Sequence, residues 1–215
     1  MPTAATTFAE QRKQERRERR KVILGAAERV YSRKPFEAVS MRDIASEAGI
    51  VVSSLYRYFP DQQSLFVEAF VEGTRKIIAR VDARISDGKI TDLTAFGLEF
   101  ISFLTENDHY FRMMTHFMLD GRLSGEPLEK LNRAARSVLD LFERVLDHCG
   151  AGGNKRTLAH TYFAALNGIL ISFRNYPGRD SAEVRRHMKK MAAVMAEALE
   201  GYGRAVVTVN GEIES

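Results

Sequence analysis

The chain has 215 residues, of which 45% are apolar and 28% are charged, with 15 Gly and 5 Pro. This composition predicts a globular protein and excludes disordered, collagen-like and disulfide-scaffold chains, which need more net charge, more Gly or more Cys. No apolar run approaches the roughly 18 residues of a membrane span, and the N-terminus lacks the apolar segment of a signal peptide. We therefore expect a cytoplasmic protein with no membrane partner, and its single cysteine, Cys149, suits a reducing compartment.

The net charge of +4 is concentrated at the start of the chain. Residues 1–60 hold 12 Lys and Arg against 7 Asp and Glu, whereas the other 155 residues hold 20 against 21. The excess lies in residues 10–21, EQRKQERRERRK. A basic arm ahead of a near-neutral body is typical of a protein that binds a polyanion. A solvated, frayed helix is the alternative explanation of such a charge run.

Apolar residues recur at helical spacing along almost the whole chain, and no strand pattern is convincing, which predicts an all-α fold of about nine helices. We expect four parts: a basic N-terminal arm at 1–20, a three-helix domain at 21–60, a larger helical body at 61–201 and a tail at 202–215. The predicted helices cover residues 22–31, 41–48, 52–58, 61–86, 91–106, 108–120, 126–149, 154–176 and 180–201.

The segment from Met41 to Tyr58 has the features of a helix-turn-helix, and Ser40 with Asp43 forms a capping-box-like start for it. Such a unit needs a small residue where two helices cross and a residue that tolerates positive φ at the turn. Ala45 and Gly49 meet these two demands. A short helical turn with glycine can show the pattern by chance, but a basic arm directly before it favours DNA binding.

Residues 36–65, FEAVSMRDIASEAGIVVSSLYRYFPDQQSL, resemble the DNA-binding domain of the TetR family of transcriptional regulators. The resemblance rests on a helix-turn-helix followed by Leu-Tyr-x-Tyr-Phe, here Leu55 to Phe59. The later part of the chain matches the family only in length and helical character. The resemblance implies an N-terminal helix-turn-helix domain followed by a larger domain that binds an effector and dimerises.

In this family the third helix would be the recognition helix, which lies in the major groove of a double-stranded DNA operator. Ser40 and Tyr56 match positions that hydrogen-bond phosphates, and Arg42 can reach a base or a phosphate. The serines of the third helix can bond base edges, and the valines at its start can contact a thymine methyl. If the arm is helical, its arginines at four-residue spacing follow the DNA backbone or enter the minor groove. The residues assigned to DNA binding are Ser40, Arg42, Val51, Val52, Ser53, Ser54, Tyr56, Arg57, Arg16 and Arg20.

Two positions depart from the family's pattern. Val51 stands where Ser or Thr commonly caps the recognition helix, so a cap worth roughly 1 kcal/mol is missing. Gln62 stands where a Lys commonly follows the Pro-Asp pair, so a charge for a phosphate is missing. The basic arm can compensate for the charge, since each Lys or Arg that neutralises a phosphate adds nearly one unit to the salt slope of binding.

Phe and Met are dense between Phe96 and Met118, and such side chains can line an adaptable apolar cavity. Composition alone is better explained by a packed core, but the family's effector pocket in this domain favours a small lipophilic or aromatic effector. The residues expected to bind this effector are Phe96, Phe100, Phe103, Phe111, Arg112, Met114, His116, Phe117, Tyr162 and Asn167.

The last two helices are apolar on more than one side, which favours a homodimer with two recognition helices for a palindromic site. Helices that cover only their own core are the alternative. The residues expected in the dimer interface are Leu166, Ile169, Phe173, Met188, Met191 and Met195.

No catalytic motif stands out, and the five histidines lack metal-ligand spacing, so we expect no enzyme activity, no metal and no cofactor. The sequence favours a ligand-responsive transcriptional regulator, most simply a repressor whose effector moves the fourth helix. One alternative is a helical small-molecule binding protein or enzyme whose arm contacts RNA or a membrane surface. Another is an architectural DNA binder without an effector.

Overall fold

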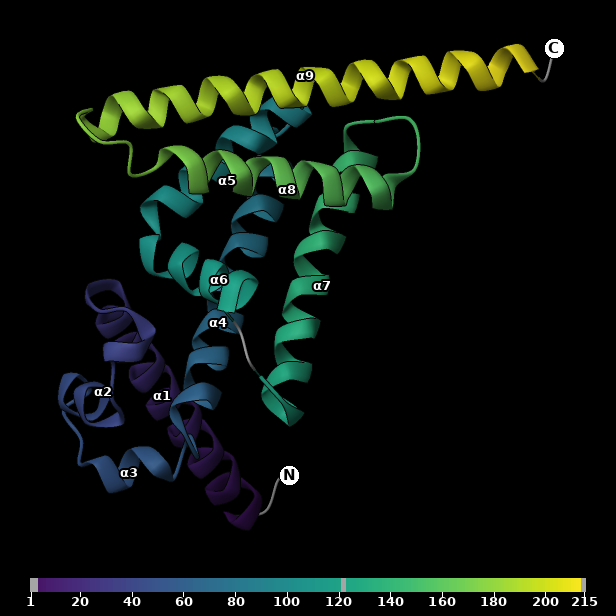
Figure 1. Cartoon of the computed structure of the whole chain (residues 1–215). Helices are drawn as coiled ribbons and strands as arrows, with labels where there is room; N and C mark the ends of the chain where they lie inside the picture. The colour runs from purple at the N-terminus through teal and green to yellow at the C-terminus, as the bar shows by residue number, and fades with distance from the viewer. Residues whose placement is uncertain (1–3, 121–122, 214–215) are drawn as a thin grey trace. The chain divides into compact units, whose positions relative to one another are not determined.

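The structure is a computed structural model and describes residues 4–120 and 123–213. These residues form nine α-helices and one short 3-10 helix, with no strand among them (Figure 1). The all-α prediction is confirmed. The elements are α1 (Ala4–Arg33), η1 (Phe36–Ala38), α2 (Met41–Glu47), α3 (Val52–Tyr56), α4 (Gln62–Ser86), α5 (Leu93–Glu106), α6 (Asp108–Asp120), α7 (Gly125–His148), α8 (Lys155–Phe173) and α9 (Ser181–Ile213).

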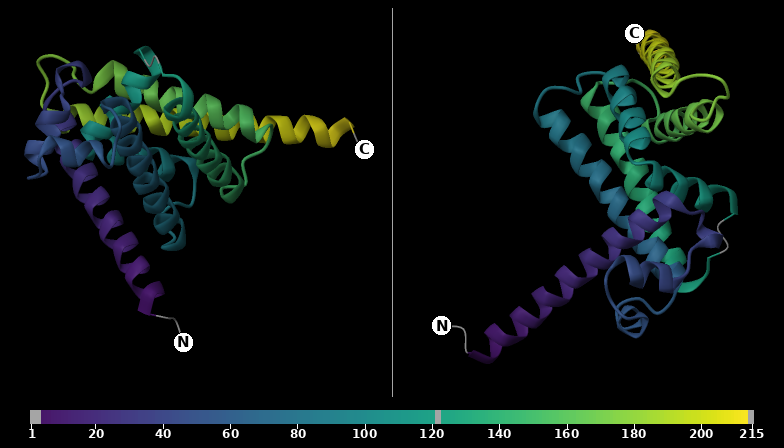
Figure 2. Two further views of the ribbon diagram at one scale, coloured as in Figure 1. Left: turned by 90° about the horizontal axis from the view of Figure 1, so that it is seen from below. Right: turned by 90° about the vertical axis from the view of Figure 1, so that its left-hand side faces the viewer.

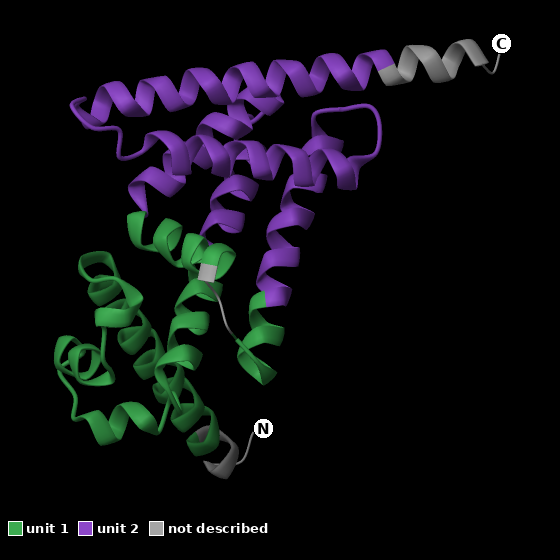
Figure 3. Ribbon diagram, viewed as in Figure 1, with its two compact units in different colours: residues 1–73, 108–131 green, residues 74–107, 132–215 purple. Residues whose placement is uncertain are grey.

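The chain divides into two compact units (Figure 3). Unit 1 comprises residues 1–73 and 108–131, and unit 2 comprises residues 74–107 and 132–215. This division differs from the expected boundary after residue 60, because α4 and α7 each contribute to both units and α6 belongs to unit 1. Helix α6 joins unit 1 through aromatic packing: the Phe117 ring lies 4.9 Å from Phe66 and 5.2 Å from Phe70.

The first helix begins at Ala4 and not at residue 22, so the basic arm and the first helix of unit 1 are one continuous helix (Figure 2). Apolar periodicity identified only the part that packs. The arm consists mainly of Arg, Lys, Glu and Gln, which have high helix propensity. It also gains side-chain pairs along one face, since Gln14 Nε2 donates to Glu18 Oε1 at 2.8 Å.

The last helix also runs further than expected, because α9 continues to Ile213 through residues predicted as a tail. Within this continued part of α9, Gly203 serves close packing. A Cβ at Gly203 would lie 2.9 Å from the backbone nitrogen of Gly152. A side chain at this position would collide with that backbone, so the close approach requires glycine.

The core of unit 2 is a cluster of aromatic rings from α5, α7 and α8. The Phe142 ring lies 4.7 Å from Phe96, 5.1 Å from Phe100 and 5.6 Å from Phe163, in each case nearly edge to face. The Tyr162 hydroxyl donates to the Leu93 carbonyl at 2.8 Å, so the one polar atom of this ring is satisfied. No helix in the described part of the chain is both long and apolar enough to cross a membrane.

Candidate nucleic-acid interface

Helices α2 and α3 form the predicted helix-turn-helix in unit 1. Ser40 caps α2: its Oγ accepts from the Asp43 backbone nitrogen at 3.2 Å, and the Asp43 carboxylate accepts from the Ser40 backbone nitrogen at 2.8 Å. Gly49 has a φ of 67°, which lets the chain turn directly after α2. The turn is closed by a hydrogen bond of 3.0 Å from the Ile50 nitrogen to the Ala45 carbonyl. The predicted capping box and glycine turn are both present.

Ion pairs fasten α2 to the end of α1. Glu47 accepts from Arg29 Nε at 2.6 Å and from Arg33 Nη2 at 3.0 Å. Lys34 Nζ donates to Asp43 Oδ1 at 2.9 Å. Lys34 and the Ser40 hydrogen bonds hold the pKa of Asp43 well below its usual range. Arg29 and Arg33 lower the pKa of Glu47 in the same way. These basic groups therefore serve the fold of unit 1.

Helix α3 presents a mixed apolar and polar surface to solvent. Leu55 is fully buried, whereas Val51 is 67% exposed and Tyr56 is 50% exposed. Ser53 and Arg57 are exposed beside them. Val51 is the N-cap residue and makes no side-chain cap hydrogen bond, as its residue type predicts. The residues assigned to base reading thus lie at the open N-terminal end of α3.

Three of the four arginines assigned to DNA are available for phosphates. Arg16, Arg42 and Arg57 are exposed, and no hydrogen bond or ion pair engages them among the described residues. The Ser40 hydroxyl is less available, because it also donates to Asp43 Oδ2 at 2.7 Å.

Arg20, the fourth arginine, points into unit 1, which corrects its assignment as a DNA contact. Its Nη1 donates to the Tyr58 carbonyl at 3.1 Å, and its Nη2 lies 3.3 Å from Glu68 Oε2. The guanidinium also lies over the Phe59 ring, 4.5 Å from the centroid. The alignment of Arg12, Arg16 and Arg20 on one helical face did not reveal that only the last reaches the folded unit.

Glu68 and Lys130 complete this contact and were not anticipated from the sequence. Lys130 Nζ lies 2.6 Å from Glu68 Oε1 and 2.9 Å from Glu126 Oε1. Both acids raise the pKa of Lys130. Glu68 therefore links the basic helix α1 and the first turns of α7. Its partner Lys130 lies 62 residues after Glu68 in the chain. No local sequence signal marks a pair so far apart.

The ten residues expected to bind the effector are divided equally between the units. Phe96, Phe100 and Tyr162 are at most 1% exposed within the aromatic cluster of unit 2, as the packed-core explanation of these residues expected. Phe103 and Asn167 are also buried in unit 2. Two of the five in unit 1, Arg112 and His116, line a cavity. The other three in unit 1, Phe111, Met114 and Phe117, are not among the residues that line this cavity.

Three of the six residues expected in the dimer interface face the core of unit 2 and not its surface. Leu166, Ile169 and Met188 are at most 5% exposed in the core of unit 2. Met191, Met195 and Phe173 are half-buried. The large exposed apolar side chains of these helices, among the described residues, are instead Ile171, at 50%, Val194, at 63%, and Tyr202, at 58%. Apolar periodicity identified the face that packs inside the unit, since that face is the more strongly apolar one.

The described residues offer little beyond binding chemistry. They contain no group of three or more His, Cys, Asp or Glu that could hold a metal ion. Burial raises the pKa of the half-buried Cys149 to about 11, so its sulfur stays a protonated thiol at neutral pH. The arrangement that stands out is therefore the exposed helix α3, with the exposed Arg42 before it and Arg57 after it in the sequence. A helix-turn-helix DNA-binding regulator is the class of protein that this fold and this surface define.

Comparison with known proteins identifies the family. Residues 23–69 match the family described as bacterial regulatory proteins, tetR family. The chain is 31% identical over 150 residues to the HTH-type transcriptional repressor KstR of Mycolicibacterium smegmatis, a match that covers 59% of this chain and 74% of that protein. It is 35% identical over 96 residues to the KstR repressor of Mycobacterium tuberculosis, over 45% of this chain and 42% of that protein. The chain belongs to the TetR family, which is regulatory and not enzymatic.

Solved structures show the same fold at low identity. A tetR-family regulator from Streptomyces coelicolor superposes with a TM-score of 0.65 at 19% identity, over 89% of this chain and 86% of that one. FadR of Bacillus subtilis, solved in complex with stearoyl-CoA, gives 0.64 at 17% identity, over 80% of this chain and 97% of that one. These likenesses extend the family fold beyond the helix-turn-helix to the later helices.

Proposed function

We propose that this chain is a homodimeric transcriptional repressor that reads a palindromic operator with α3 and is released by a small lipophilic or aromatic effector. The observation that carries the proposal is the exposed face of α3, held by a capped α2 and accompanied by arginines that have no partner in the described protein. The names of the two mycobacterial relatives support the repressor role, since both are transcriptional repressors.

The exposed groups divide into base-reading and phosphate-binding residues. Val51, with Val52 beside it, offers apolar contact to a thymine methyl, and Ser53 with Ser54 can donate to or accept from base edges. Tyr56, Arg42, Arg57 and Arg16 are suited to phosphates, which position a protein without reading its sequence. The Ser40 hydroxyl would have to share its Asp43 hydrogen bonds to take part.

The outward faces of α8 and α9 support the dimer. Ile171 and Val194 are large, apolar and exposed, and Ala164 and Gly168 lie exposed on α8. Small residues let a second helix approach closely, and a two-fold interface uses the same patch twice. We expect Ile171→Glu to convert a dimer to a monomer in light scattering, while Arg136→Glu, at an exposed site of α7 outside the proposed interface, leaves the dimer intact.

The effector is proposed as an apolar or amphipathic small molecule. The related FadR structure holds stearoyl-CoA, and a fold relative from Saccharomonospora viridis holds choline, so the fold admits different ligand chemistries. Helix α4 has residues in both units, which supports a mechanism in which an effector shifts the population of DNA-binding states through α4. Such a shift requires that the effector prefer one state over the other.

The test is selection of bound duplexes from a random DNA pool by the full chain, followed by the salt dependence of binding to the selected sequence. Enrichment of a palindrome with half-sites about one helical turn apart is the expected result. Enrichment of no sequence would overturn operator reading and reduce the basic arm to a nonspecific surface.

The division of roles has its own test with single variants. Tyr56→Phe removes one phosphate bond and should weaken binding to all sequences alike, whereas Ser53→Ala should change which sequences are preferred. Equal loss of sequence preference from both variants would contradict the division.

A further inference from the structure

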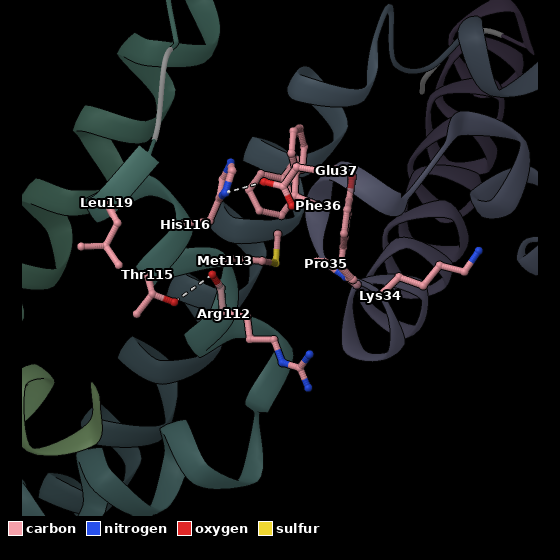
Figure 4. Close-up of a pocket in the computed structure, with 11 residues that line it drawn as sticks. Lys34, Pro35, Phe36, Glu37, Arg112, Met113, Thr115, His116 and Leu119 are labelled. Carbon is pink, nitrogen blue, oxygen red and sulfur yellow. Dashed lines mark hydrogen bonds and ion pairs between the residues drawn. The ribbon is translucent and has the colours of Figure 1, made fainter. Parts of the chain in front are cut away.

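Unit 1 contains a cavity of about 310 Å³ that the DNA interface does not use (Figure 4). One wall is the end of α1 with the residues that follow it as far as η1, the other wall is α6, and Phe66 of α4 also lines the cavity. Figure 4 shows Pro35 and Phe36 on the first wall, with Met113 and His116 on the second. All the lining residues belong to unit 1.

The apolar part of the cavity is built from flat rings. The Phe66 ring lies 4.7 Å from Tyr31 and 4.6 Å from Phe36. The His116 imidazole lies 4.7 Å from Phe36 and 5.4 Å from Phe66. Ring faces and edges in this arrangement favour a planar or slender apolar ligand. The volume lies at the small end of the range for ligand sites.

The polar part of the cavity is biased toward positive charge. Its lining holds Lys34 and Arg112, against one carboxylate, Glu37, which lies 3.6 Å from His116 Nδ1. The Arg112 guanidinium makes one hydrogen bond, from Nε to Asp108 Oδ2 at 2.5 Å. No other partner of this guanidinium is found in the described residues. Its two terminal nitrogens are therefore available for a planar anion such as a carboxylate.

Tyr31 supplies a second unused polar group. The residue is 3% exposed, and its hydroxyl has no hydrogen-bond partner of normal geometry among the described residues. Burial raises the pKa of this phenol far above its usual value, and the neighbouring Gln62 side chain opposes the rise. A buried hydroxyl without a partner costs free energy that a ligand oxygen or an enclosed water can recover.

We propose that this cavity binds a small aromatic or short aliphatic carboxylate, with its apolar part among Phe36, Phe66 and Met113 and its carboxylate on Arg112. The proposal deepens the proposed function, on which its regulatory meaning rests, by giving the effector a site and a chemical class. It places that site inside the DNA-binding unit itself.

The cavity is connected to the helix-turn-helix by one ion pair. Lys34 lines the cavity and holds Asp43, the residue that completes the cap of α2. A carboxylate that attracts the Lys34 ammonium competes with Asp43 and weakens the start of α2, where Arg42 lies. Binding of the acid therefore lowers operator affinity, because the acid prefers the state in which α2 is less firmly held.

The test uses full-length protein and two probes of nearly equal shape, 1-naphthoate and the uncharged 1-naphthylmethanol, in titration calorimetry. We expect saturable binding of 1-naphthoate and at least tenfold weaker binding of the alcohol. Arg112→Gln should weaken 1-naphthoate roughly tenfold, as expected for loss of one charged hydrogen-bonded pair. Arg136→Gln, at an exposed arginine of α7 outside the cavity, is the matched control and should change nothing. Thr115→Trp, which narrows the cavity, should weaken both probes.

Three results would overturn the proposal: no saturable binding of 1-naphthoate, equal binding of acid and alcohol, or an unchanged affinity in Arg112→Gln and Thr115→Trp. Circular dichroism of each variant excludes unfolding as the cause of a loss. Operator binding by wild-type protein without any probe tests the proposed function separately. If the protein binds 1-naphthoate but no operator, the proposed regulator function is wrong and the cavity site stands. If it binds an operator but not 1-naphthoate, only the cavity site is wrong.

Discussion

The helix-turn-helix of unit 1 and the aromatic cluster of unit 2 are stabilised by different forces. Helices α2 and α3 have only 7 and 5 residues, too few to be stable alone. Helix α2 depends on a capping box and on ion pairs of half-exposed groups, whereas α3 is anchored by the buried Leu55. Helices α5, α7 and α8 have 14, 24 and 19 residues and bury their rings against one another. An element that must keep its working face exposed has little apolar area to bury, so polar contacts at its ends carry more of its stability. The DNA-binding helices should therefore respond to salt and acid before the aromatic cluster does.

The largest effect is expected from Phe142→Ala in the aromatic cluster. Phe142 is 1% exposed and packs against four other rings, so the substitution leaves a cavity and should cost about 3–5 kcal/mol of unfolding free energy. Urea unfolding monitored by far-ultraviolet circular dichroism measures this loss. Phe8→Ala, at a ring that is 67% exposed on the arm, is the control and should cost less than about 0.5 kcal/mol. A similar cost for both substitutions would contradict the difference drawn between the regions.

The next effect concerns two arginines of α1 that look alike in sequence. Arg20→Met should weaken operator binding about tenfold, or about 1.4 kcal/mol, because it releases the end of the recognition segment at Tyr58 and Phe59. It should leave the salt dependence of binding unchanged, since Arg20 faces Glu68 and not a phosphate. Arg16→Met should instead reduce the slope of log affinity against log salt by about 0.9. A reduced slope in Arg20→Met would restore Arg20 as a phosphate contact.

A smaller effect is expected at the cap of α2. Ser40→Ala removes the side-chain acceptor of the Asp43 backbone nitrogen and should destabilise unit 1 by about 1 kcal/mol. Amide hydrogen exchange should quicken in α2 and stay unchanged in α5. Ser46→Ala, at an exposed position inside α2, is the control and should not quicken exchange in either helix. Faster exchange in α5 would show that the cap matters beyond its own helix.

What could be predicted from the sequence follows from the range of the interactions involved. The helix-turn-helix depends on contacts between residues close in sequence, such as the Ser40 cap and the Gly49 turn, so its position was predictable. The continuous helix of the arm was missed because apolar spacing reports packing, whereas the arm is helical through propensity. The inward role of Arg20 depends on Tyr58 and Glu68, and the cavity brings Phe36 together with His116. Only the fold reveals pairs so distant in sequence.

The smallest expected effect is that of lowered pH, which should open the helix-turn-helix before the aromatic cluster. The pKa of Asp43 and that of Glu47 are both depressed in the folded state by neighbouring basic groups. Their contribution to stability is therefore complete above the unfolded-state pKa values of about 4 and is lost as the pH falls below them. Hydrogen exchange in residues 41–47 should quicken between about pH 4.5 and pH 3, before that in residues 93–106 does. Asp43→Asn should remove part of this pH dependence, because the variant has no charge to lose. If α5 opened at the same pH as α2, the ion pairs would not distinguish the helix-turn-helix from the aromatic cluster.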